Sequence, residues 1–464
     1  MNPTEQQRPL DVLILAAGLG TRMKSQKAKV LHELGGRPMI AHVVRQALTL
    51  NPGRIYVVVG HQAGEVEAAV RNELGDKADL AEFVTQSQQR GTGDAVKAAS
   101  DKLQHADRTL LVLSGDVPLV RAETLRKLIA HHLADQAACS ILTVKLENPA
   151  GYGRMVCDEK GGFVKIVEQK DATPEEKQIR EINSGIYCFE TAKLFAALDQ
   201  VEPTNQQAEY YLTDVPAILL AEGARIAIYL HTDAREVSGI NTRADLAEFE
   251  NLLRRSTIRS LMSEGVTFID PSHSYVGMDA RIGRDCVIYP DVLIEGRTII
   301  GEGCVIRSGS RITNAKIGDR VEIKDHCVII DSEIESNCSV GPFAHLRMNA
   351  CLEEGSAVGN FVEVKKSRLG RGSKSMHLTY LGDATIGERT NIGAGTITCN
   401  YDGKNKHETV IGDNVKIGSD TMLVAPVKVG SGSVTAAGSV IISDVPPDSL
   451  VAGVPAVVKK KLKP

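Results

Sequence analysis

Residues 281–300, RIGRDCVIYPDVLIEGRTII, decide the fold of the C-terminal half, because an isoleucine occupies every sixth position of this stretch. The six-residue spacing begins at Val276 and runs, with slips of five residues, to Ile441. A period of six fits neither the period of about 3.6 of a helix nor the period of two of a strand. Glycine follows the aliphatic residue at intervals of eighteen, as at Gly283 and Gly301, so three hexads make one coil. The pattern predicts a three-sided parallel β-solenoid with coils stacked about 4.8 Å apart.

The same spacing predicts that the residue four positions after each aliphatic one also faces the narrow interior and is small. The residues at these positions are Ala280, Cys286, Val292, Cys304, Ser310, Cys327, Cys338, Ser356, Val362, Thr421, Ser433 and Ser439. The chain has nine cysteines and no C-x-x-C pair, so we interpret the cysteines as small core residues rather than as a metal site or disulfide framework.

The six-residue rhythm stops twice, between residues 369 and 386 and again between residues 398 and 411. We interpret both interruptions as polar insertions. Insertions in a solenoid form loops on one side, often the binding side. The sequence therefore predicts a binding site near these two segments.

Length and composition limit the remaining possibilities. A chain of 464 residues is too long for one core, and we predict a first domain of residues 1–241, a helix of residues 242–264 and a solenoid domain of residues 265–464. A net charge of −4 with interspersed signs excludes the basic footprint of a nucleic-acid-binding protein. No apolar run reaches the length of about twenty residues that a membrane span needs, and the N-terminal residues are polar, so we expect a cytoplasmic protein with no membrane or nucleic-acid partner.

The N-terminal half alternates predicted strands and helices, which is typical of a doubly wound α/β fold with a mostly parallel sheet. The apolar run 11–17, DVLILAA, leads into Gly18-Leu19-Gly20-Thr21-Arg22. This loop is neither a Walker loop nor a dinucleotide fingerprint. With Arg22 and Lys29 close behind, it could hold a polyphosphate, and a tight turn beside solvated cations is the alternative. We expect helices at 37–50 and 64–74, and a further helix from Gly91 to about Leu103.

Several polar residues of this half follow strands or stand beside glycines. Asp116 follows the predicted strand 109–113, where a carboxylate could bind Mg²⁺ or cap a helix. Gly153, Glu168 and Asn183 have neighbours suited to reading sugar hydroxyls. Asn241 immediately precedes the amphipathic helix predicted over 242–264.

The motifs taken together resemble one family. They are LILAAGLGTRM at 13–23, KVLH at 29–32, Gln86 with GTG at 91–93, GDVPL at 115–119, GYGR at 151–154, EINSG at 181–185, HLTYLGD at 377–383 and NIGAGTITCNYDG at 391–403. They resemble the bifunctional N-acetylglucosamine-1-phosphate uridylyltransferase/glucosamine-1-phosphate N-acetyltransferase family nearly end to end. The resemblance implies a doubly wound, Rossmann-like nucleotidyltransferase domain and a C-terminal left-handed parallel β-helix of hexapeptide repeats that forms a homotrimer.

The resemblance implies roles for residues of the first half. The residues expected to hold the uridine nucleotide are Leu15, Ala16, Ala17, Gly18, Lys29, Gln86, Gly91 and Thr92. Asp116 and Asn241 are expected to bind Mg²⁺, and Arg22 to lie beside the triphosphate of UTP. Gly153, Glu168 and Asn183 match positions that contact the sugar nucleotide. The implied reaction is in-line attack of a sugar phosphate on the α-phosphorus of UTP, which needs positioning and charge neutralisation more than a protein nucleophile.

In the second half, His377 matches the catalytic histidine that takes a proton from an amine attacking the thioester of acetyl-CoA. Glu363 is expected to orient that ring or balance its charge. Arg347 and Lys365 are expected to bind the sugar phosphate, and Tyr380 and Asn391 to complete the sugar pocket. The positions that match the acetyl-CoA groove are Ala394, Asn400, Tyr401, Ser419 and Ala437. Without the surrounding motif, a histidine in a polar loop is more often a surface residue.

Two positions depart from the family pattern. Ser114 stands where some members have an aromatic residue, and residues 452–455, AGVP, lack an arginine that some members place there for coenzyme A. Two other hypotheses also remain at this point. One is a sugar-phosphate nucleotidyltransferase whose solenoid only oligomerises or regulates, and the other is a structural solenoid with an inert α/β cap.

Overall fold

The computed structural model describes residues 9–103 and 107–461. The chain divides into two compact units, Met1–Phe249 and Glu250–Pro464, and the division falls inside helix α8 (Arg243–Ser263). Residues 1–8, whose polar character contributed to the expectation of a cytoplasmic protein, lie outside the described residues. Among the helices of the described residues, none combines the length and the apolar character needed to cross a membrane.

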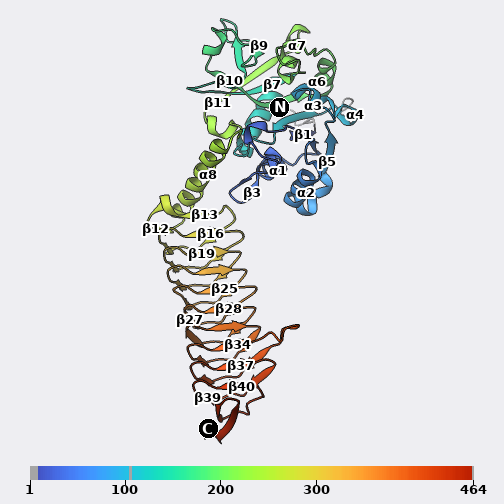
Figure 1. Ribbon diagram of the computed structural model, residues 1–464. Helices are drawn as coiled ribbons and strands as arrows, with labels where there is room; N and C mark the ends of the chain where they lie inside the picture. The colour runs from blue at the N-terminus through green and yellow to red at the C-terminus, as the bar shows by residue number, and fades with distance from the viewer. Residues whose placement is uncertain (1–8, 104–106, 462–464) are drawn as a thin grey trace, which may run out of the picture. The chain divides into compact units, whose positions relative to one another are not determined.

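Unit 1 is built on a twisted sheet, seen at the top of Figure 1. In spatial order its main strands are β11 (Ile226–His231), β7 (Cys139–Lys145), β10 (Glu181–Glu190), β6 (Thr109–Ser114), β1 (Leu10–Leu15), β4 (Ile55–Val59) and β5 (Ala81–Thr85). Strand β10 is antiparallel to both neighbours, and the other adjacent pairs are parallel. The strand order reverses at β1, which pairs with both β4 and β6. In open α/β sheets ligands bind outside the carboxyl ends of strands at such a reversal.

Helices cover both faces of this sheet. Alternate residues of the central strand β1 therefore pack into two separate hydrophobic cores, one on each face. Val12 and Ile14 of β1 pack in one core, while Leu13 packs in the other. The helices of unit 1 are α1 (Met39–Leu48), α2 (Ala63–Leu74), α3 (Thr92–Lys97), α4 (Ser100–Leu103), α5 (Ala122–Ala134), α6 (Thr191–Leu198) and α7 (Val215–Ala221). Two further pairs of strands are β2 (Glu33–Leu34) with β3 (Arg37–Pro38) and β8 (Arg154–Cys157) with β9 (Phe163–Val167).

The expected α/β class is confirmed, and the ends of most helices agree to within two residues. The single helix expected from Gly91 to Leu103 is wrong. The Ala99 N–H donates to the Val96 carbonyl three residues back at 3.0 Å, so the regular ladder ends and α3 and α4 are separate.

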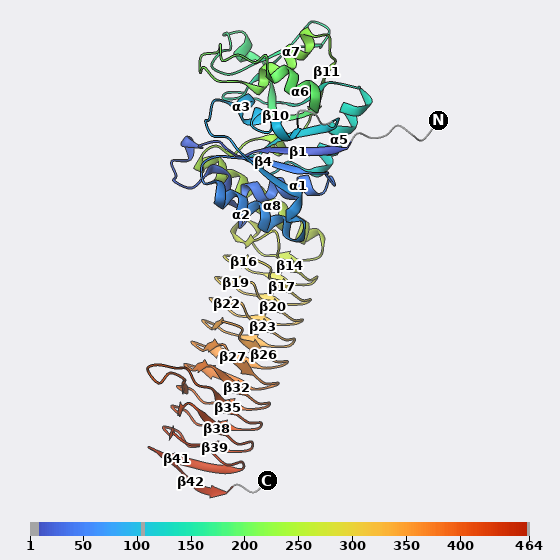
Figure 2. The same ribbon diagram turned by 90° about the vertical axis from the view of Figure 1, so that its right-hand side faces the viewer.

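Unit 2 is a left-handed parallel β-helix with three sheets. The first sheet contains β12 (Thr267–Phe268), β15 (Val287–Ile288), β18 (Val305–Ile306), β21 (Glu322–Ile323), β24 (Ser339–Val340), β27 (Ala357–Asn360), β30 (Lys374–His377), β33 (Asn391–Ile392), β36 (Lys416–Ile417), β39 (Val434–Thr435), β41 (Ser449–Gly453) and β42 (Ala456–Lys461). The second sheet contains β13 (Tyr275–Val276), β16 (Leu293–Glu295), β19 (Arg311–Thr313), β22 (Val328–Ile330), β25 (His345–Arg347), β28 (Glu363–Lys365), β31 (Tyr380–Gly382), β34 (Ile397–Cys399), β37 (Met422–Val424) and β40 (Val440–Ile441). The third sheet contains β14 (Arg281–Ile282), β17 (Ile299–Ile300), β20 (Lys316–Ile317), β23 (Glu333–Ile334), β26 (Cys351–Leu352), β29 (Arg368–Leu369), β32 (Ala384–Ile386), β35 (Thr409–Ile411) and β38 (Val427–Val429). Figure 2 shows these short strands stacked coil upon coil.

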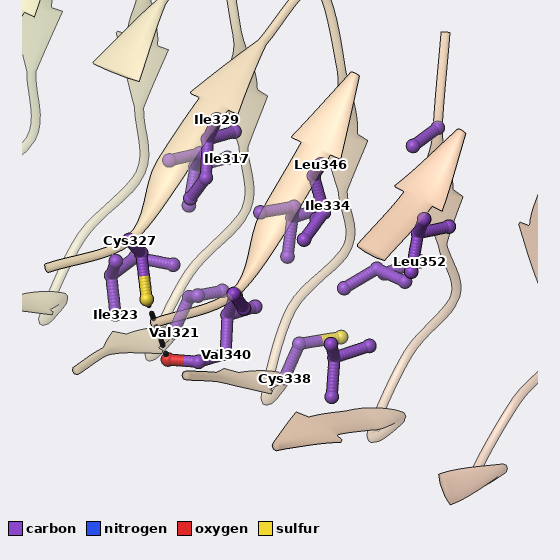
Figure 3. Packing of buried hydrophobic residues seen from close by; sticks show 14 of the residues in the cluster. Ile317, Val321, Ile323, Cys327, Ile329, Ile334, Cys338, Val340, Leu346 and Leu352 are labelled. Carbon is purple, nitrogen blue, oxygen red and sulfur yellow. Dashed lines mark hydrogen bonds between the residues drawn. The ribbon is translucent and has the colours of Figure 1, made fainter. Parts of the chain in front are cut away.

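The interior of the prism is filled by the six-residue series, as predicted. Ile317, Ile323 and Ile329 are buried on three sides of one coil, and Figure 3 shows them with their neighbours. Every residue expected at the small interior positions is buried. All nine cysteines are free thiols, and the Cys327 thiol donates to the Val340 carbonyl of the next coil at 3.6 Å. The four cysteines expected inside the prism therefore serve as core residues, as the sequence predicted.

The first interruption of the rhythm is not an insertion. Ser375 pairs with Val358 on the coil before and Ile392 on the coil after, so it occupies an interior aliphatic position in an unbroken coil. The rhythm is lost there because a serine replaces an aliphatic residue. The second interruption is a true insertion, since Thr385 pairs with Val410 and residues 400–408 lie outside the prism as an extra loop. Figure 1 shows this loop projecting from the side of the helix.

Candidate active sites

The loop after β1 leaves its backbone open to a ligand. Ala16 and Ala17 are buried at the end of the strand, whereas a side chain built on Gly18 would meet nothing within 4 Å. Gly20 has a left-handed backbone with φ 61°, and its Cα lies against the Lys29 side chain. Any larger residue at Gly20 would displace Lys29, so the glycine keeps the loop close to that cation.

Four of the predicted residues gather beside this loop. The Lys29 ammonium forms an ion pair with the Asp116 carboxylate and donates to Asn241 Oδ1 at 2.8 Å. Arg22 Nη2 donates to the same Asn241 oxygen at 2.8 Å. Asp116 lies two residues beyond β6 and Asn241 lies two residues before α8, so distant segments of unit 1 meet here.

This arrangement fits a divalent cation. The oxygens of Asp116 and Asn241 both contact one ammonium group, which shows that the two oxygens converge on a single cation position. Carboxylate and amide oxygens are ligands that Mg²⁺ prefers, and Mg²⁺ usually takes only one or two protein ligands plus water and phosphate oxygens. Within the described residues no cluster of three or more His, Cys, Asp or Glu forms a fuller metal cage.

Asn241 is held in place by the start of α8. The Asp245 carboxylate accepts hydrogen bonds from the backbone N–H groups of Asn241 at 2.8 Å and Thr242 at 2.9 Å, and Thr242 Oγ1 accepts from the Asp245 N–H at 3.1 Å. This reciprocal pattern is a capping box. Burial opposes ionisation of Asp245, but these hydrogen bonds keep its pKa below the usual value. The cap therefore fixes both the helix start and the position of Asn241.

Gly153, Glu168 and Asn183 are neighbours in the structure. The Asn183 N–H donates to the Gly153 carbonyl at 2.9 Å, and a Cβ at Gly153 would lie 3.4 Å from Glu168 Oε1. Glu168 accepts from Thr213 Oγ1 at 3.2 Å, and burial raises the pKa of its carboxyl. A half-buried carboxylate and a buried amide beside a glycine can form hydrogen bonds with hydroxyl groups.

Two further residues lie near this group. Arg154, which the sequence showed only as part of a motif, is fully buried and donates from Nη2 to Gln169 Oε1 at 2.7 Å. A Cβ atom built on Gly185 would lie 3.3 Å from the Ser114 Oγ, so the Ser114 side chain packs closely against Gly185.

Gln86, Gly91 and Thr92 lie together at the end of β5 and the start of α3. Gln86 Nε2 donates to the Gly91 carbonyl at 3.2 Å and to Asp94 Oδ2 at 2.9 Å. Thr92 Oγ1 accepts from the Leu212 N–H at 3.1 Å. The resemblance did not single out Asp94.

In unit 2, His377 begins a column of residues that continues over four coils. Ser375 pairs with Ile392 between β30 and β33. Two residues further along both segments, the same register places His377 opposite Ala394. The Asp420 N–H donates to the Ala394 carbonyl at 2.7 Å, and the Gly438 N–H donates to the Ser419 carbonyl at 2.8 Å. Ala394, Ser419 and Ala437 therefore lie on the coils that follow His377, near one corner of the prism, and all three have small side chains.

The hydrogen-bond partner of the His377 ring is Asn360. His377 Nδ1 lies 2.7 Å from Asn360 Oδ1, and the two residues pair between β27 and β30. Within the described residues no hydrogen bond joins Glu363 to His377, and the Glu363 carboxylate forms an ion pair with Arg347 at 2.6 Å. The role expected for Glu363, to orient the ring or balance its charge, stays a prediction. Asn360 lies one coil, or seventeen residues, before His377, and that spacing is the signal that could have identified it.

The basic residues form a second group beside the inserted loop. Lys365 lies 3.2 Å from Asp383, which also binds Lys366 and accepts from Asn400 Nδ2 at 2.6 Å. Burial opposes ionisation of Asp383, but Lys365 and Asn400 hold its pKa below the usual value. Lys406 of the loop lies close enough to Lys365 that the neighbouring ammonium lowers the pKa of Lys406. Two crowded cations of this kind suit a phosphate dianion.

The remaining predicted residues surround these groups. The Tyr380 phenol lies across Gly382, and Asn391 pairs with Lys374 on the preceding coil. Tyr401 is exposed on the inserted loop, where its hydroxyl donates to the Gly403 carbonyl at 2.6 Å. Of residues 452–455, Ala452 and Gly453 end β41 and Val454 and Pro455 form the turn to β42, on which Lys459 and Lys460 are exposed.

Comparison with known proteins gives matches to both halves. A MobA-like NTP transferase domain matches residues 12–160, a GMPPB C-terminal domain matches residues 271–368 and the bacterial transferase hexapeptide family (six repeats) matches residues 408–443. A protein from Geobacillus sp. (strain WCH70) named "Bifunctional protein GlmU" is 49% identical over 438 residues, covering 94% of each chain. Proteins of the same name from Trichlorobacter lovleyi and Heliobacterium modesticaldum are 47% and 49% identical over 94% and 97% of this chain, and over 94% and 96% of their own. The chain therefore belongs to the bifunctional GlmU family.

Proposed function

We propose that each activity of this bifunctional transferase of UDP-N-acetylglucosamine biosynthesis resides in one unit. Unit 2 acetylates glucosamine-1-phosphate with acetyl-CoA, and unit 1 then transfers UMP from UTP to N-acetylglucosamine-1-phosphate and releases pyrophosphate. The product supplies peptidoglycan and, where it is made, lipid A. The observation that supports this division is that two groups of family motif residues converge in space, one within each compact unit. Because UTP and acetyl-CoA are cytoplasmic metabolites, we place the enzyme in the cytoplasm.

In unit 1, Asp116 and Asn241 would hold Mg²⁺, which supplies Lewis-acid stabilisation of charge on the phosphate oxygens. The open backbone of Gly18 would lie against the nucleotide, with Arg22 beside the triphosphate. Lys29 would leave the Asp116 carboxylate and contact a phosphate oxygen. Glu168, Asn183 and Gly153 would orient the sugar so that its phosphate attacks in line.

Lys29 gives a prediction about cation binding in the absence of nucleotide. Its ammonium now contacts both proposed metal ligands, so metal must displace it. We expect Lys29→Met to tighten Mn²⁺ binding by the nucleotide-free protein about tenfold or more, a change of about 1.4 kcal/mol. Calorimetric titration with Mn²⁺ measures this constant directly.

A suitable control is Lys27→Met, since Lys27 is more exposed and lies 3.9 Å from Glu33. That variant is expected to bind Mn²⁺ as the unchanged protein does. Equal Mn²⁺ affinity in Lys29→Met and the unchanged protein would show that the ammonium does not occupy the cation position in solution.

In unit 2, His377 would act as the general base. With Asn360 Oδ1 as the acceptor, Nδ1 carries the ring proton and Nε2 presents its lone pair to the substrate ammonium group. The amine freed of its proton attacks the thioester carbonyl, and the thiol of coenzyme A leaves. Arg347, Lys365 and Lys406 would bind the sugar phosphate, while Tyr380 and Asn391 complete the sugar pocket. The acetyl-CoA arm would follow Ala394, Ser419 and Ala437, with Asn400 and Tyr401 on the inserted loop.

The homotrimer forms part of the proposal. One corner of the prism carries a column of stacked side chains, with 5.1 Å between the ring centres of His326 and Phe343 and 5.3 Å between Phe343 and Phe361. Phe343, Phe361 and Leu378 are 48%, 56% and 62% exposed, so three apolar residues on successive coils face solvent in one chain. Leu378 directly follows His377. An apolar surface of this kind favours contact with a neighbouring copy, and a closed ring of three copies would cover it.

We expect Phe361→Glu to dissociate the trimer, because a charge would replace an aromatic ring at the centre of the column. Light scattering after gel filtration would then give a mass near that of one chain instead of three. Ile299→Glu is a matched control, since Ile299 is 47% exposed but lies on the third sheet. A Phe361→Glu protein that remains trimeric would place the interface elsewhere.

The proposal as a whole is tested by one coupled assay. The protein is mixed with glucosamine-1-phosphate, acetyl-CoA, UTP and Mg²⁺, and thiol and pyrophosphate are followed separately. Thiol release that depends on glucosamine-1-phosphate, and pyrophosphate release that depends on its acetylated product, are the expected results. Pyrophosphate release without thiol release would leave the solenoid with a regulatory or oligomerising role.

A further inference from the structure

The Gln86 side chain is held in one orientation before any ligand binds. It is 6% exposed, and its Nε2 donates one hydrogen bond to the Gly91 carbonyl and another to Asp94 Oδ2. An amide NH₂ group has two N–H bonds, so both are used. In the flipped orientation the amide oxygen Oε1 would face the Gly91 carbonyl and Asp94 Oδ2 and be repelled by both. The orientation with Nε2 toward these two acceptors is therefore the one adopted.

Asp94 is itself held from the other side. Its second oxygen, Oδ1, accepts from Arg90 Nη2 at 2.7 Å, and the Arg90 guanidinium lies 5.4 Å from the centre of the Tyr210 ring. The backbone is fixed at the same place, since the Tyr210 N–H donates to the Arg90 carbonyl at 2.7 Å and the Gly93 N–H donates to the Tyr210 carbonyl at 2.8 Å. The Asp94 carboxylate therefore has a defined position from which it can hold Gln86.

These contacts determine which hydrogen-bonding atom Gln86 can present to the nucleobase of a bound nucleotide. With both N–H bonds occupied, only its Oε1 remains, and no donor within the described part of the chain reaches that oxygen. An amide oxygen accepts a hydrogen bond from the imide N–H of uracil. Cytosine presents a lone pair at the same ring position, so two acceptors would face each other. A buried pair of unsatisfied acceptors costs about 1–3 kcal/mol.

We propose that Asp94 is a positioning residue that locks the Gln86 amide in the orientation that accepts uracil and rejects cytosine. This inference rests on the proposed placement of the uridine nucleotide at Gln86. Asp94 does not touch the nucleotide in this arrangement. It acts through Gln86, and the same carboxylate is kept in place by Arg90.

The test compares the kcat/KM values of pyrophosphate release with UTP and with CTP in the full-length enzyme. In Asp94→Leu the Gln86 amide loses the shorter and charged of its two acceptors, and the remaining bond to the Gly91 carbonyl at 3.2 Å is weak enough for the amide to turn its N–H toward cytosine. The ratio of the UTP value to the CTP value is expected to fall at least about tenfold. Asp94→Asn keeps an oxygen that can accept from Gln86 and is expected to keep the ratio within about threefold. A merely structural role for Asp94 would lower both values together and leave the ratio unchanged, which would overturn the inference.

Two further variants separate this inference from the proposed function. Arg90→Met removes the group that holds Asp94 from the other side but leaves the carboxylate beside Gln86, so its ratio is expected to fall less than in Asp94→Leu. In Gln86→Met the ratio is expected to fall as in Asp94→Leu. A fall in Gln86→Met without one in Asp94→Leu would refute only the role of Asp94. No fall in either would place the base away from Gln86 and would refute the proposed nucleotide site as well.

Discussion

Replacing His377 with alanine is expected to lower acetyl transfer about 10²–10⁴-fold, the usual contribution of a positioned general base. UMP transfer to added N-acetylglucosamine-1-phosphate should be unchanged, because its proposed residues lie within unit 1. The loss should appear in kcat, since the ring acts on the proton that leaves the attacking amine and contributes little to substrate binding. Thiol release and pyrophosphate release, measured on the same preparation, check both halves of this expectation.

Two other variants support the interpretation of that result. Asn360→Ala leaves the imidazole in place but removes the acceptor 2.7 Å from Nδ1, so the ring can adopt the other tautomer. We expect a smaller loss of acetyl transfer than in His377→Ala. His273→Ala changes an exposed histidine of unit 2 that lies outside the site and is paired with Asp270, and no loss is expected. Unchanged thiol release in His377→Ala would favour the hypothesis that the solenoid only oligomerises or regulates.

The solenoid could be predicted in detail because its physical requirement repeats. Each coil must fill the same narrow interior, so Ile317, Ile323 and Ile329 recur at fixed spacing and can be read directly from the sequence. The same rule failed at Ser375, because a small polar side chain at an interior position looks like a loop residue when only the aliphatic pattern is read. The backbone pairing of Ser375 with Val358 and Ile392 restores the coil there.

The site could be predicted in part. Family motifs identified Lys29, Asp116 and Asn241, but their convergence depends on which strands are neighbours, and a linear motif does not contain that information. The residues that hold His377 and Gln86 through hydrogen bonds were missed for the same reason. Asn360 holds His377 across one coil and Asp94 holds Gln86 across the turn that opens α3, and neither contact follows from the residue type alone.

The second large effect is expected for Asp116→Ala, which should lower UMP transfer at least about 10²-fold and spare acetyl transfer. The change removes the carboxylate proposed to bind Mg²⁺ and leaves the Lys29 ammonium in contact with Asn241 alone. The weaker hold on Mg²⁺ lowers neutralisation of the triphosphate, and the freed Lys29 ammonium does not replace a divalent cation. Pyrophosphate release at saturating UTP measures the loss, and Mn²⁺ titration of the nucleotide-free protein should show weakened cation binding.

A matched control is Asp101→Ala, because Asp101 is an exposed aspartate of α4 in the same unit. That variant is expected to retain both activities and the same Mn²⁺ affinity. In Asp116→Ala, loss of both activities while the assembly stays intact would contradict separable sites, because no residue of the acetyl-transfer group belongs to unit 1. Full UMP transfer in the same variant would instead remove Asp116 from the cation site and leave the ion pair with Lys29 as its only role. The two activities of one preparation thus distinguish a coupled enzyme from one that carries two independent centres on a single chain.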